Sequence, residues 1–289
     1  MMNSPNTGRL KVKWDSVIAF TLIHLVALAA IFTFTWKAFW AFVVLQWLTG
    51  GLGICFCYHR LLTHRSFKIW KPVEYLFAVF GCLAYQNGPV KWVAIHRVHH
   101  ANSDRPNDPH SPTRGFWWAH MGWLFAFDET LDSFEKYRNF APDLANDKVY
   151  RFLNDTHGIY QVILAVGLYL WGGWPVVIWG VFLRTVFMWH CTWLVNSAAH
   201  MWGYRTWAVE DQSTNNWWVA LLTYGEGWHN NHHAFPRSAA HGLKWWEFDV
   251  TYWTVRTLAA LGLTSEIQLP SIEQKERLAS RPPAEAVAA

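Results

Sequence analysis

Long apolar runs alternate along this chain with polar segments that are rich in histidine. Residues 17–36 have the sequence VIAFTLIHLVALAAIFTFTW and contain no charged side chain. A helix of about 20 residues, rising 1.5 Å per residue, covers the roughly 30 Å hydrocarbon layer of a bilayer. A second run of similar length, residues 38–58, follows after Lys37 alone. This pattern predicts two membrane-spanning helices joined as a tight hairpin, with both ends on the same side.

The pattern predicts a second hairpin farther along the chain. Residues from Ile159 to about Asn196 are mostly apolar, and GGWP at 172–175 interrupts them with residues typical of a turn. Between the hairpins, residues 73–86 and 115–127 are apolar but shorter, which favours interfacial or half-buried helices. We therefore expect an all-α membrane protein whose four transmembrane helices form two hairpins.

Composition supports a membrane setting. Aromatic residues make up 18% of the 289 residues and 22 are Trp, an enrichment typical of membrane–water interfaces. The net charge is only +4, and no basic, aromatic-interleaved segment indicates a nucleic-acid partner. No C-x-x-C pair occurs, so buried free thiols are expected at all four cysteines: Cys55, Cys57, Cys82 and Cys191.

The distribution of positive charge predicts the orientation. The connection inside the first hairpin carries only Lys37, whereas basic residues flank both of its ends, which places those ends in the cytoplasm. The flanking basic residues are Arg9, Lys11, Lys13, Arg60, Arg65, Lys68 and Lys71. The apolar run that follows residues 1–13 is too long for the hydrophobic segment of a signal peptide and lacks a small-residue cleavage site, so the first span is expected to be retained. One domain is expected over residues 1–275, followed by a disordered tail over 276–289.

Nine of the 15 histidines fall into four groups, and the spacing H-x-x-H-H occurs twice. On an α-helix, positions i, i+3 and i+4 share one face, so each H-x-x-H-H group is predicted to aim three imidazoles at one point. The i, i+5 pair in HRLLTH does not share a narrow face and suits two different metal ions or a helix end. The groups are His59 and His64; His96, His99 and His100; His200; and His229, His232 and His233.

These groups predict a metal centre. Imidazole is a ligand for Fe, Zn, Cu and Ni, and a structural zinc ion uses four ligands with no open position. Nine ligands are too many for one ion, so two ions with four or five histidines each, and with open positions, fit the count better. All four groups follow predicted spans or lie in non-spanning segments, so we expect them to converge at the cytoplasmic membrane face.

Other interpretations account for fewer of these residues. A bis-histidine haem uses one His from each of two helices, and a metal-ion transporter needs ligands near the bilayer midplane. Arg184, inside the second hairpin, is either functional or paired with a polar group of another span. Ordinary polar roles are expected for the remaining histidines, with His110 and His120 as the foremost exceptions: His24, His110, His120, His157, His190 and His241.

Five segments resemble the histidine boxes and flanks of the membrane fatty acid desaturases, especially the stearoyl/Δ9 branch. They are HRLLTHRSF, HRVHHANSD, DPHSPTRGFWWAHMGW, NSAAHMWG and GEGWHNNHHAFP, in matching order from about His59 to Pro236. The resemblance implies a four-span helical domain with a cytosolic helical cap. It also implies two Fe²⁺ ions held by the nine histidines, O₂ as co-substrate, and Asn196 as the holder of a metal-bound water.

The activity implied by the resemblance is O₂-dependent formation of a cis double bond, at Δ9, in a saturated acyl chain. A hydroxylase or ketolase of the same iron class is the alternative. Carboxylates expected to orient the imidazoles are Asp104, Asp108 and Glu226. Residues matching family positions near the acyl tunnel or headgroup are Gln86, Asn87 and Trp92. No segment is long enough for a cytochrome b5 module, so electrons are expected from a separate ferredoxin or cytochrome b5-type protein.

The chain departs from the animal acyl-CoA branch of that family at two charged pairs. That branch has Arg-Asp before the second box and Arg-Lys after HMGW, charges suited to a phosphorylated headgroup. This sequence has Ala94-Ile95 and Phe127-Asp128 instead, which favours an acyl chain esterified to a glycerolipid over acyl-CoA. Basic residues able to compensate for the loss are Lys91, Arg97 and Arg114.

Overall fold

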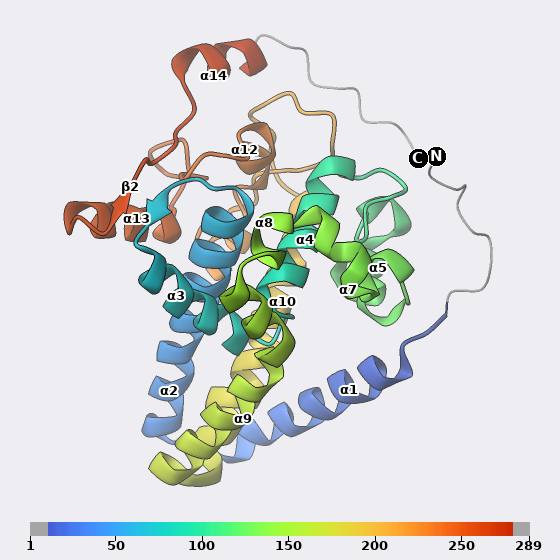
Figure 1. The fold of residues 1–289 in the computed structure, drawn as a ribbon, viewed down its shortest axis with the longest axis vertical. Helices are drawn as coiled ribbons and strands as arrows, with labels where there is room; N and C mark the ends of the chain where they lie inside the picture. The colour runs from blue at the N-terminus through green and yellow to red at the C-terminus, as the bar shows by residue number, and fades with distance from the viewer. Residues whose placement is uncertain (1–10, 280–289) are drawn as a thin grey trace.

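The computed structural model describes residues 11–279, which are almost entirely helical (Figure 1). Residues 1–10 and 280–289 lie outside this part, and with them Arg9 and most of the predicted tail. The elements are α1 (Trp14–Leu28), η1 (Ala29–Phe32), α2 (Trp36–Gln46), η2 (Trp47–Thr63), β1 (Lys68–Ile69), α3 (Lys71–Leu83), α4 (Pro89–Asn102), η3 (Pro112–Arg114), α5 (Phe116–His120), η4 (Gly122–Phe125), α6 (Glu129–Asp132), α7 (Phe134–Tyr137), η5 (Arg138–Phe140), α8 (Pro142–Ala145), α9 (Lys148–Val177), η6 (Ile178–Leu183), α10 (Arg184–Asn196), η7 (Ala198–His200), α11 (Trp217–Leu222), α12 (His229–Ala234), α13 (Val250–Ala260), β2 (Thr264–Ser265) and α14 (Ile272–Ala279).

Within the described residues, three helical runs are long and apolar enough to cross a membrane: Trp14–Phe32, Trp36–Thr63 and Lys148–His200. The third run has 53 residues and contains a sharp break at Gly173, whose φ of 70° and ψ of −165° are not helical. The predicted turn at GGWP is therefore present. After it the chain continues into η6, which packs against α9.

The first hairpin turns slightly earlier than predicted. The helical run ends at Phe32, and α2 begins at Trp36 because the Thr35 hydroxyl accepts a hydrogen bond from the backbone N–H of Ala38. Lys37 therefore lies in the first turn of α2 and not in the connection. A side-chain cap of this kind satisfies a backbone donor that the start of a helix leaves free.

The end of the second run is wound as a π-helix, η2, and lies deep in the protein. Its glycines allow close packing: a Cβ on Gly53 would lie 2.5 Å from the backbone nitrogen of Gly81 in α3. Tyr58 packs over Gly81 in turn, and Phe56 contacts Phe77 edge to face. This close approach buries the last turns of η2, where the first histidine group lies.

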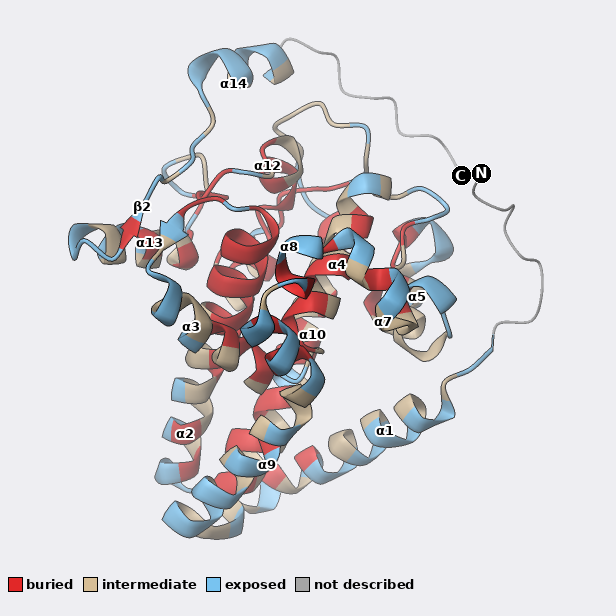
Figure 2. Cartoon of the chain, in the orientation of Figure 1, coloured by how far each residue is buried: buried red, intermediate tan, exposed pale blue. Residues whose placement is uncertain are grey.

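Burial divides the molecule into two regions (Figure 2). Buried residues concentrate where η2, α3, α4 and α12 meet, whereas the far ends of α1, α2 and α9 are mostly exposed. The exposed side chains there are large and apolar, including Phe32 and Leu170. An apolar outer surface on long helices suits contact with lipid. All four cysteines are free and buried, as expected.

Two shorter segments differ in how well they match the prediction. Residues 73–86 fall largely within one helix, α3. Residues 115–127 do not form a single helix, because Met121 has a φ of −146° and separates α5 from the 3₁₀ helix η4. Residues 276–279 of the predicted tail belong to α14, which ends at Ala279.

Candidate metal centre

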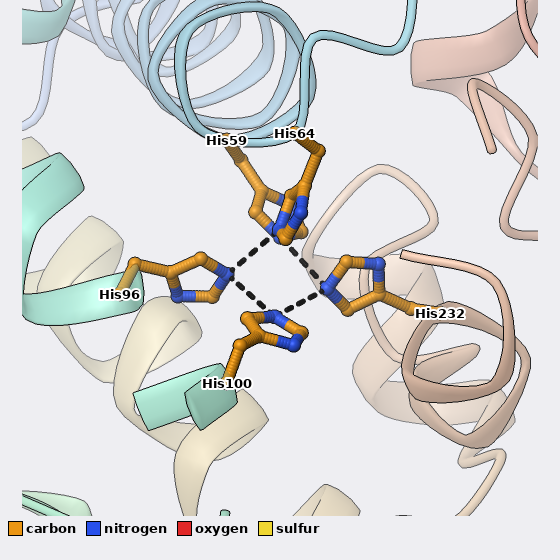
Figure 3. Close-up of side chains that lie close together, drawn as sticks. All are labelled: His59, His64, His96, His100 and His232. Atoms are coloured by element: carbon orange, nitrogen blue, oxygen red, sulfur yellow. Dashed lines mark hydrogen bonds between the residues drawn. The ribbon is translucent and has the colours of Figure 1, made fainter. Parts of the chain in front are cut away.

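The nine grouped histidines converge on one region in two clusters. In each cluster the candidate ligand atoms lie within 4.8 Å of one another. The five-histidine cluster contains His59, His64, His96, His100 and His232 (Figure 3). The four-histidine cluster contains His99, His200, His229 and His233. The clusters adjoin, since the rings of His100 and His233 are stacked with centroids 4.6 Å apart. The predicted division into groups of four and five is therefore present.

Each H-x-x-H-H group contributes to both clusters, so the prediction that its three imidazoles meet at one point is wrong. In α4, His96 and His100 belong to the five-histidine cluster and His99 to the other. In α12, His229 and His233 belong to the four-histidine cluster and the middle histidine to the other. At 3.6 residues per turn, positions i and i+4 differ by about 40° and position i+3 lies about 100° from i+4. The spacing therefore serves two neighbouring sites.

The i, i+5 pair His59 and His64 belongs to a single cluster. The local winding explains this, because in a π-helix the hydrogen bonds join residues five apart and bring i and i+5 close together. The backbone N–H of His64 donates to the carbonyl of His59 at 3.2 Å, and the two rings are 4.9 Å apart. His64 also caps the helix, so the expected helix end is present, whereas the alternative of two different ions is wrong.

The imidazoles of the five-histidine cluster face one another through their Nε2 atoms. Neighbouring Nε2 atoms lie 3.1 Å apart for His59 and His232, 2.9 Å for His232 and His100, 3.1 Å for His100 and His96, and 3.2 Å for His96 and His64 (Figure 3). A neutral imidazole carries only one N–H. If the Nδ1 atoms carry the hydrogens, these Nε2 lone pairs face each other without donors, an arrangement suited to a cation.

Four carboxylates lie beside Nδ1 atoms of the clusters. A carboxylate that accepts the Nδ1–H of a histidine fixes the tautomer with the Nε2 lone pair free, as metal-binding histidines require. The pairs are His59 with Glu226 at 2.6 Å, His99 with Asp108 at 2.9 Å, His200 with Asp104 at 3.1 Å, and His233 with Asp211 at 2.8 Å. All three carboxylates singled out from the sequence make such contacts, and Asp211 is an addition that no motif marked.

The electrostatics of the five-histidine cluster keep three of its imidazoles neutral and the Glu226 carboxylate charged. Burial lowers the pKa of His96, His100 and His232 well below the usual value, and neighbouring imidazoles lower it further. Burial alone would raise the pKa of Glu226, but the Arg60 guanidinium outweighs it and holds that pKa well below its usual range. Neutral imidazole beside carboxylate is the combination that binds a transition-metal ion.

Arg60 positions the Glu226 carboxylate. The Arg60 side chain is fully buried and donates from Nε to Glu226 at 3.0 Å and from Nη1 to Asp249 at 2.9 Å. From the sequence, Arg60 was expected only to be one of the positive charges that flank the first hairpin. Because its neighbour in the chain is His59, the same turn of η2 supplies both an imidazole and the cation that holds that imidazole's carboxylate.

Two further histidines border the clusters. His110, expected to be an exception among the ungrouped histidines, has its ring 4.4 Å from that of His99. His241 was assigned an ordinary role, yet its ring lies 4.4 Å from that of His232 and its Nδ1 lies 2.9 Å from Glu226. An isolated histidine in a loop carries no spacing pattern, so the sequence could not single it out.

The other ungrouped histidines lie outside both clusters. His24 and His190 approach through their Nε2 atoms at 3.2 Å, and His190 Nδ1 lies 2.9 Å from His120 Nε2. His120 Nδ1 lies 3.0 Å from the Ser197 hydroxyl, so His120 is not part of either cluster. His157 bonds to a backbone carbonyl of its own helix. These contacts match the ordinary polar roles expected for His24, His157 and His190.

Arg184 has the paired role that was one of its two alternatives. Its Nη2 donates to Gln161 of α9 at 3.1 Å and its Nη1 to the carbonyl of Leu83 at 2.6 Å. A further contact at 3.3 Å joins Nη1 to Thr49 of η2. The buried charge therefore joins three helices near the start of α10.

A cavity of about 1530 Å³ adjoins the five-histidine cluster and is lined by His96. All three residues matched to the acyl tunnel or headgroup line it, as does Asn196: Gln86, Asn87 and Trp92. Trp92 donates to Gln86 at 3.3 Å, and Gln86 donates to Thr192 at 2.9 Å. Lys91 and Arg114 also line the cavity, whereas Arg97 does not and pairs with Asp143.

The family model described as fatty acid desaturase matches residues 34–268. The chain is 48% identical over 275 residues to the sn-1 stearoyl-lipid 9-desaturase of Anabaena variabilis, covering 94% of this chain and 100% of that protein. It is 47% identical to the sn-2 palmitoyl-lipid 9-desaturase of Nostoc sp., covering 92% of each. It is 46% identical to the icosanoyl-CoA 5-desaturase of Limnanthes douglasii, covering 95% of this chain and 79% of that protein.

Proposed function

This chain belongs to the fatty acid desaturase family, and on that premise we propose that it is a di-iron enzyme forming a cis Δ9 double bond in a lipid-linked acyl chain. A desaturase is an oxidoreductase. The observation that carries the iron centre is the pair of adjoining histidine clusters beside a large cavity. In the overall reaction, a saturated –CH₂–CH₂– unit, O₂, two electrons and two protons give –CH=CH– and two water molecules.

The donor set fits two Fe²⁺ ions. Imidazole lone pairs facing one another without donors, and Nδ1 atoms held by carboxylates, suit cations of this kind. The proposed ligands are the nine histidines of the two clusters, and Asn196 is proposed to hold a water at the centre. When bound, the iron supplies the oxidising strength, drawn from O₂, that no side chain has.

The side chains of the cavity position the substrate. Trp92, Gln86 and Thr192 form a hydrogen-bonded series in the wall of the cavity. The ring of Trp92 also stacks on that of His96, with centroids 5.1 Å apart. An acyl chain held against this series passes directly beside the five-histidine cluster. Positioning of this kind is worth several powers of ten in rate when the reacting atoms are held in place.

The basic residues that line the cavity already contact other side chains of the protein, which favours a lipid-linked substrate over acyl-CoA. Lys91 pairs with Asp132 at 3.0 Å, and Lys13 pairs with the same carboxylate at 3.1 Å. The Arg114 guanidinium lies over the ring of Trp118, 3.2 Å from its centroid. These contacts already occupy charges that a phosphorylated CoA headgroup would need. The two matched Δ9 relatives are named for stearoyl-lipid and palmitoyl-lipid, which supports the same choice.

The proposed topology has four spans. Counting the two arms on either side of Gly173 separately turns the third long run into a second hairpin. The lower ends of α2 and α9 lie toward the lower end of Figure 1, and the histidine-bearing elements α4 and α12 lie toward the upper end. Together with the charge rule, this arrangement supports a cytoplasmic position for both termini and the active site. An external ferredoxin or cytochrome b5-type donor would dock on that side.

The test is double-bond formation in a host that expresses the protein and is fed defined saturated acyl chains. Mass spectrometry should locate a new cis Δ9 bond in glycerolipids, and His229→Ala should abolish it and lower bound iron. His190→Ala is the matched control, because His190 lies outside both clusters and does not line the cavity. A new hydroxyl without a double bond would favour a hydroxylase or ketolase. A haem absorption band in the purified protein would favour an electron carrier.

A further inference from the structure

A second, apolar cavity lies on the neighbouring face of α1. It has a volume of about 440 Å³, within the roughly 300–1,000 Å³ typical of ligand sites. Besides α1, its lining includes Met121 and Phe125 at the two ends of η4, Leu183 of η6 and Val186 of α10. Leu25 and Leu28 of α1, which also line it, are 58% and 59% exposed. The cavity is therefore an apolar groove that opens along the outer surface of a membrane-spanning run.

The two cavities occupy neighbouring faces of α1. Beyond its first two residues, Trp14 and Asp15, α1 lines the large cavity with Ser16, Ala19, Phe20 and Ile23, which follow the i, i+3, i+4, i+7 spacing of one helix face. The residues of α1 that line the small cavity lie on the adjacent face: Val17, Phe20, Thr21, His24, Leu25, Ala27 and Leu28. Both cavities therefore extend along α1, side by side.

Phe20 lies between the two cavities. It lines both, and its ring stacks on Trp189 at 4.3 Å and meets Phe125 edge to face at 5.4 Å. Trp189 belongs to the lining of the large cavity and Phe125 to that of the small one. The packed rings of Phe20, Trp189 and Phe125 therefore contribute to the wall between the two spaces.

A polar rim lies just before the point where the grooves begin. Lys13, Asp15 and Ser16 line only the large cavity, and the small one starts at Val17. A ligand with a polar head and two apolar chains matches this arrangement. Its head would lie at the rim, and one chain would enter each groove.

We propose that the small cavity holds the second acyl chain of a diacyl glycerolipid whose first chain lies in the large cavity beside the histidine clusters. This rests on the proposed function and narrows its substrate class. The two chains of a glycerolipid leave neighbouring carbon atoms, which suits two grooves that share the side chain of Phe20. An acyl-CoA has one chain and leaves the small groove unused, so the groove provides a physical basis for a preference for lipid-linked chains.

The second chain positions the first. In a bilayer both chains are already in an apolar medium, so filling the groove gains packing and orientation, with little hydrophobic free energy. A chain fixed in the small groove limits how far the glycerol can slide along the rim, and so fixes which carbon pair of the other chain reaches the clusters. Loss of that restraint is expected to reduce the rate by about tenfold.

The decisive variant fills the small groove. Leu25→Trp places an indole there, and Thr21→Trp does so from the next turn as a second variant. Leu22→Trp is the matched control, because Leu22 lies on the same helix, is 56% exposed and lines neither cavity. The substrates are a distearoyl glycerolipid and the lysolipid with the same headgroup and one stearoyl chain, presented in detergent micelles to the iron-loaded enzyme with a reductant.

The groove-filling variants should lower kcat/KM for the distearoyl lipid by about tenfold and leave that for the lysolipid unchanged, whereas Leu22→Trp should change neither. Equal effects on both substrates, or no effect on either, would overturn the proposal. The second outcome would indicate that bulk lipid fills the groove.

Binding of a pyrene-labelled diacyl lipid to the iron-free protein provides a readout that does not depend on catalysis. Leu25→Trp should weaken this binding and Leu22→Trp should not. Groove-dependent binding, together with no double-bond formation by the iron-loaded enzyme, would refute the proposed function and leave the two-groove site standing. Desaturation with equal binding by all variants would refute the two-groove site alone.

Discussion

Replacing Asp108 by Asn should remove one metal ion and leave the other. Asp108 is buried, and its Oδ2 lies 2.9 Å from His99 Nδ1 and accepts the backbone N–H of Asp104 at 2.9 Å. Burial alone would raise the pKa of Asp108, but His99 and His110 outweigh it and hold that pKa well below its usual range. The carboxylate is therefore charged at any working pH. An amide of the same shape can turn its NH₂ toward Nδ1, which moves the imidazole hydrogen to Nε2.

The expected loss follows from the role of such partners. Groups that orient a metal-binding histidine are typically worth 10–100-fold in metal affinity, which corresponds to about 1.4–2.7 kcal/mol. His99 is one of four imidazoles in its cluster. The five-histidine cluster is oriented through Glu226 and does not contact Asp108 directly. Bound iron should therefore fall from two ions toward one per chain.

Iron retention against a chelator, followed by elemental analysis, measures this effect. The wild type and Asp108→Asn should lose the first ion at chelator concentrations that differ by about 10–100-fold. Asp143→Asn is the control, because Asp143 is a carboxylate that pairs with Arg65 and Arg97 away from both clusters. Unchanged retention of both ions, or equal loss of both, would refute the assignment of Asp108 to one cluster.

Other predictions concern packing, a buried charge and pH. Gly53→Ala should lower the free energy of unfolding by about 1–3 kcal/mol, because the new Cβ would lie 2.5 Å from backbone atoms of Phe80 and Gly81; an unchanged thermal midpoint would contradict it. Arg184→Met should destabilise by about 3 kcal/mol, seen as a lower midpoint in detergent, since it leaves buried acceptors unpaired; a higher midpoint would show that the charge costs more than its contacts return. Burial and the nearby Arg60 lower the pKa of His241 to about 4. Between about pH 6.5 and 4, His241 is therefore protonated in the unfolded chain and neutral in the folded one. The free energy of unfolding should fall over this range by up to about 3 kcal/mol as the pH is lowered. In metal-free protein, His241→Gln should show a shallower fall, and parallel pH profiles would contradict this.

The long apolar helices could be predicted from the sequence more accurately than the residues at which they end. Apolar run length marked the membrane-crossing helices, because span length depends only on consecutive residues and the bilayer thickness. Helix ends were less accurate. The hydroxyl of Thr35 and the dihedral angles of Gly173 set the turns, and such caps change a boundary by a few residues without changing the apolar pattern.

The histidine spacings determined which nine histidines come together in the two clusters. They did not determine how the imidazoles divide, since an i, i+3, i+4 triplet suits one site or two equally well until a second helix approaches. The π-helical winding before His64, the buried contact of Arg60 with Glu226, and the positions of Asp211 and His241 also depend on chain segments far apart in sequence.

The sequence alone therefore specified the long apolar helices, the nine clustered histidines and three of the four carboxylates beside them, because these depend on composition and on spacing along one segment. Only the tertiary structure decided which histidine belongs to which cluster, the place of Asp211 and the paired cavities along α1. The physical reason is that each of these features forms between segments whose approach is fixed by packing, such as the close contact of η2 with α3 at Gly53 and Gly81.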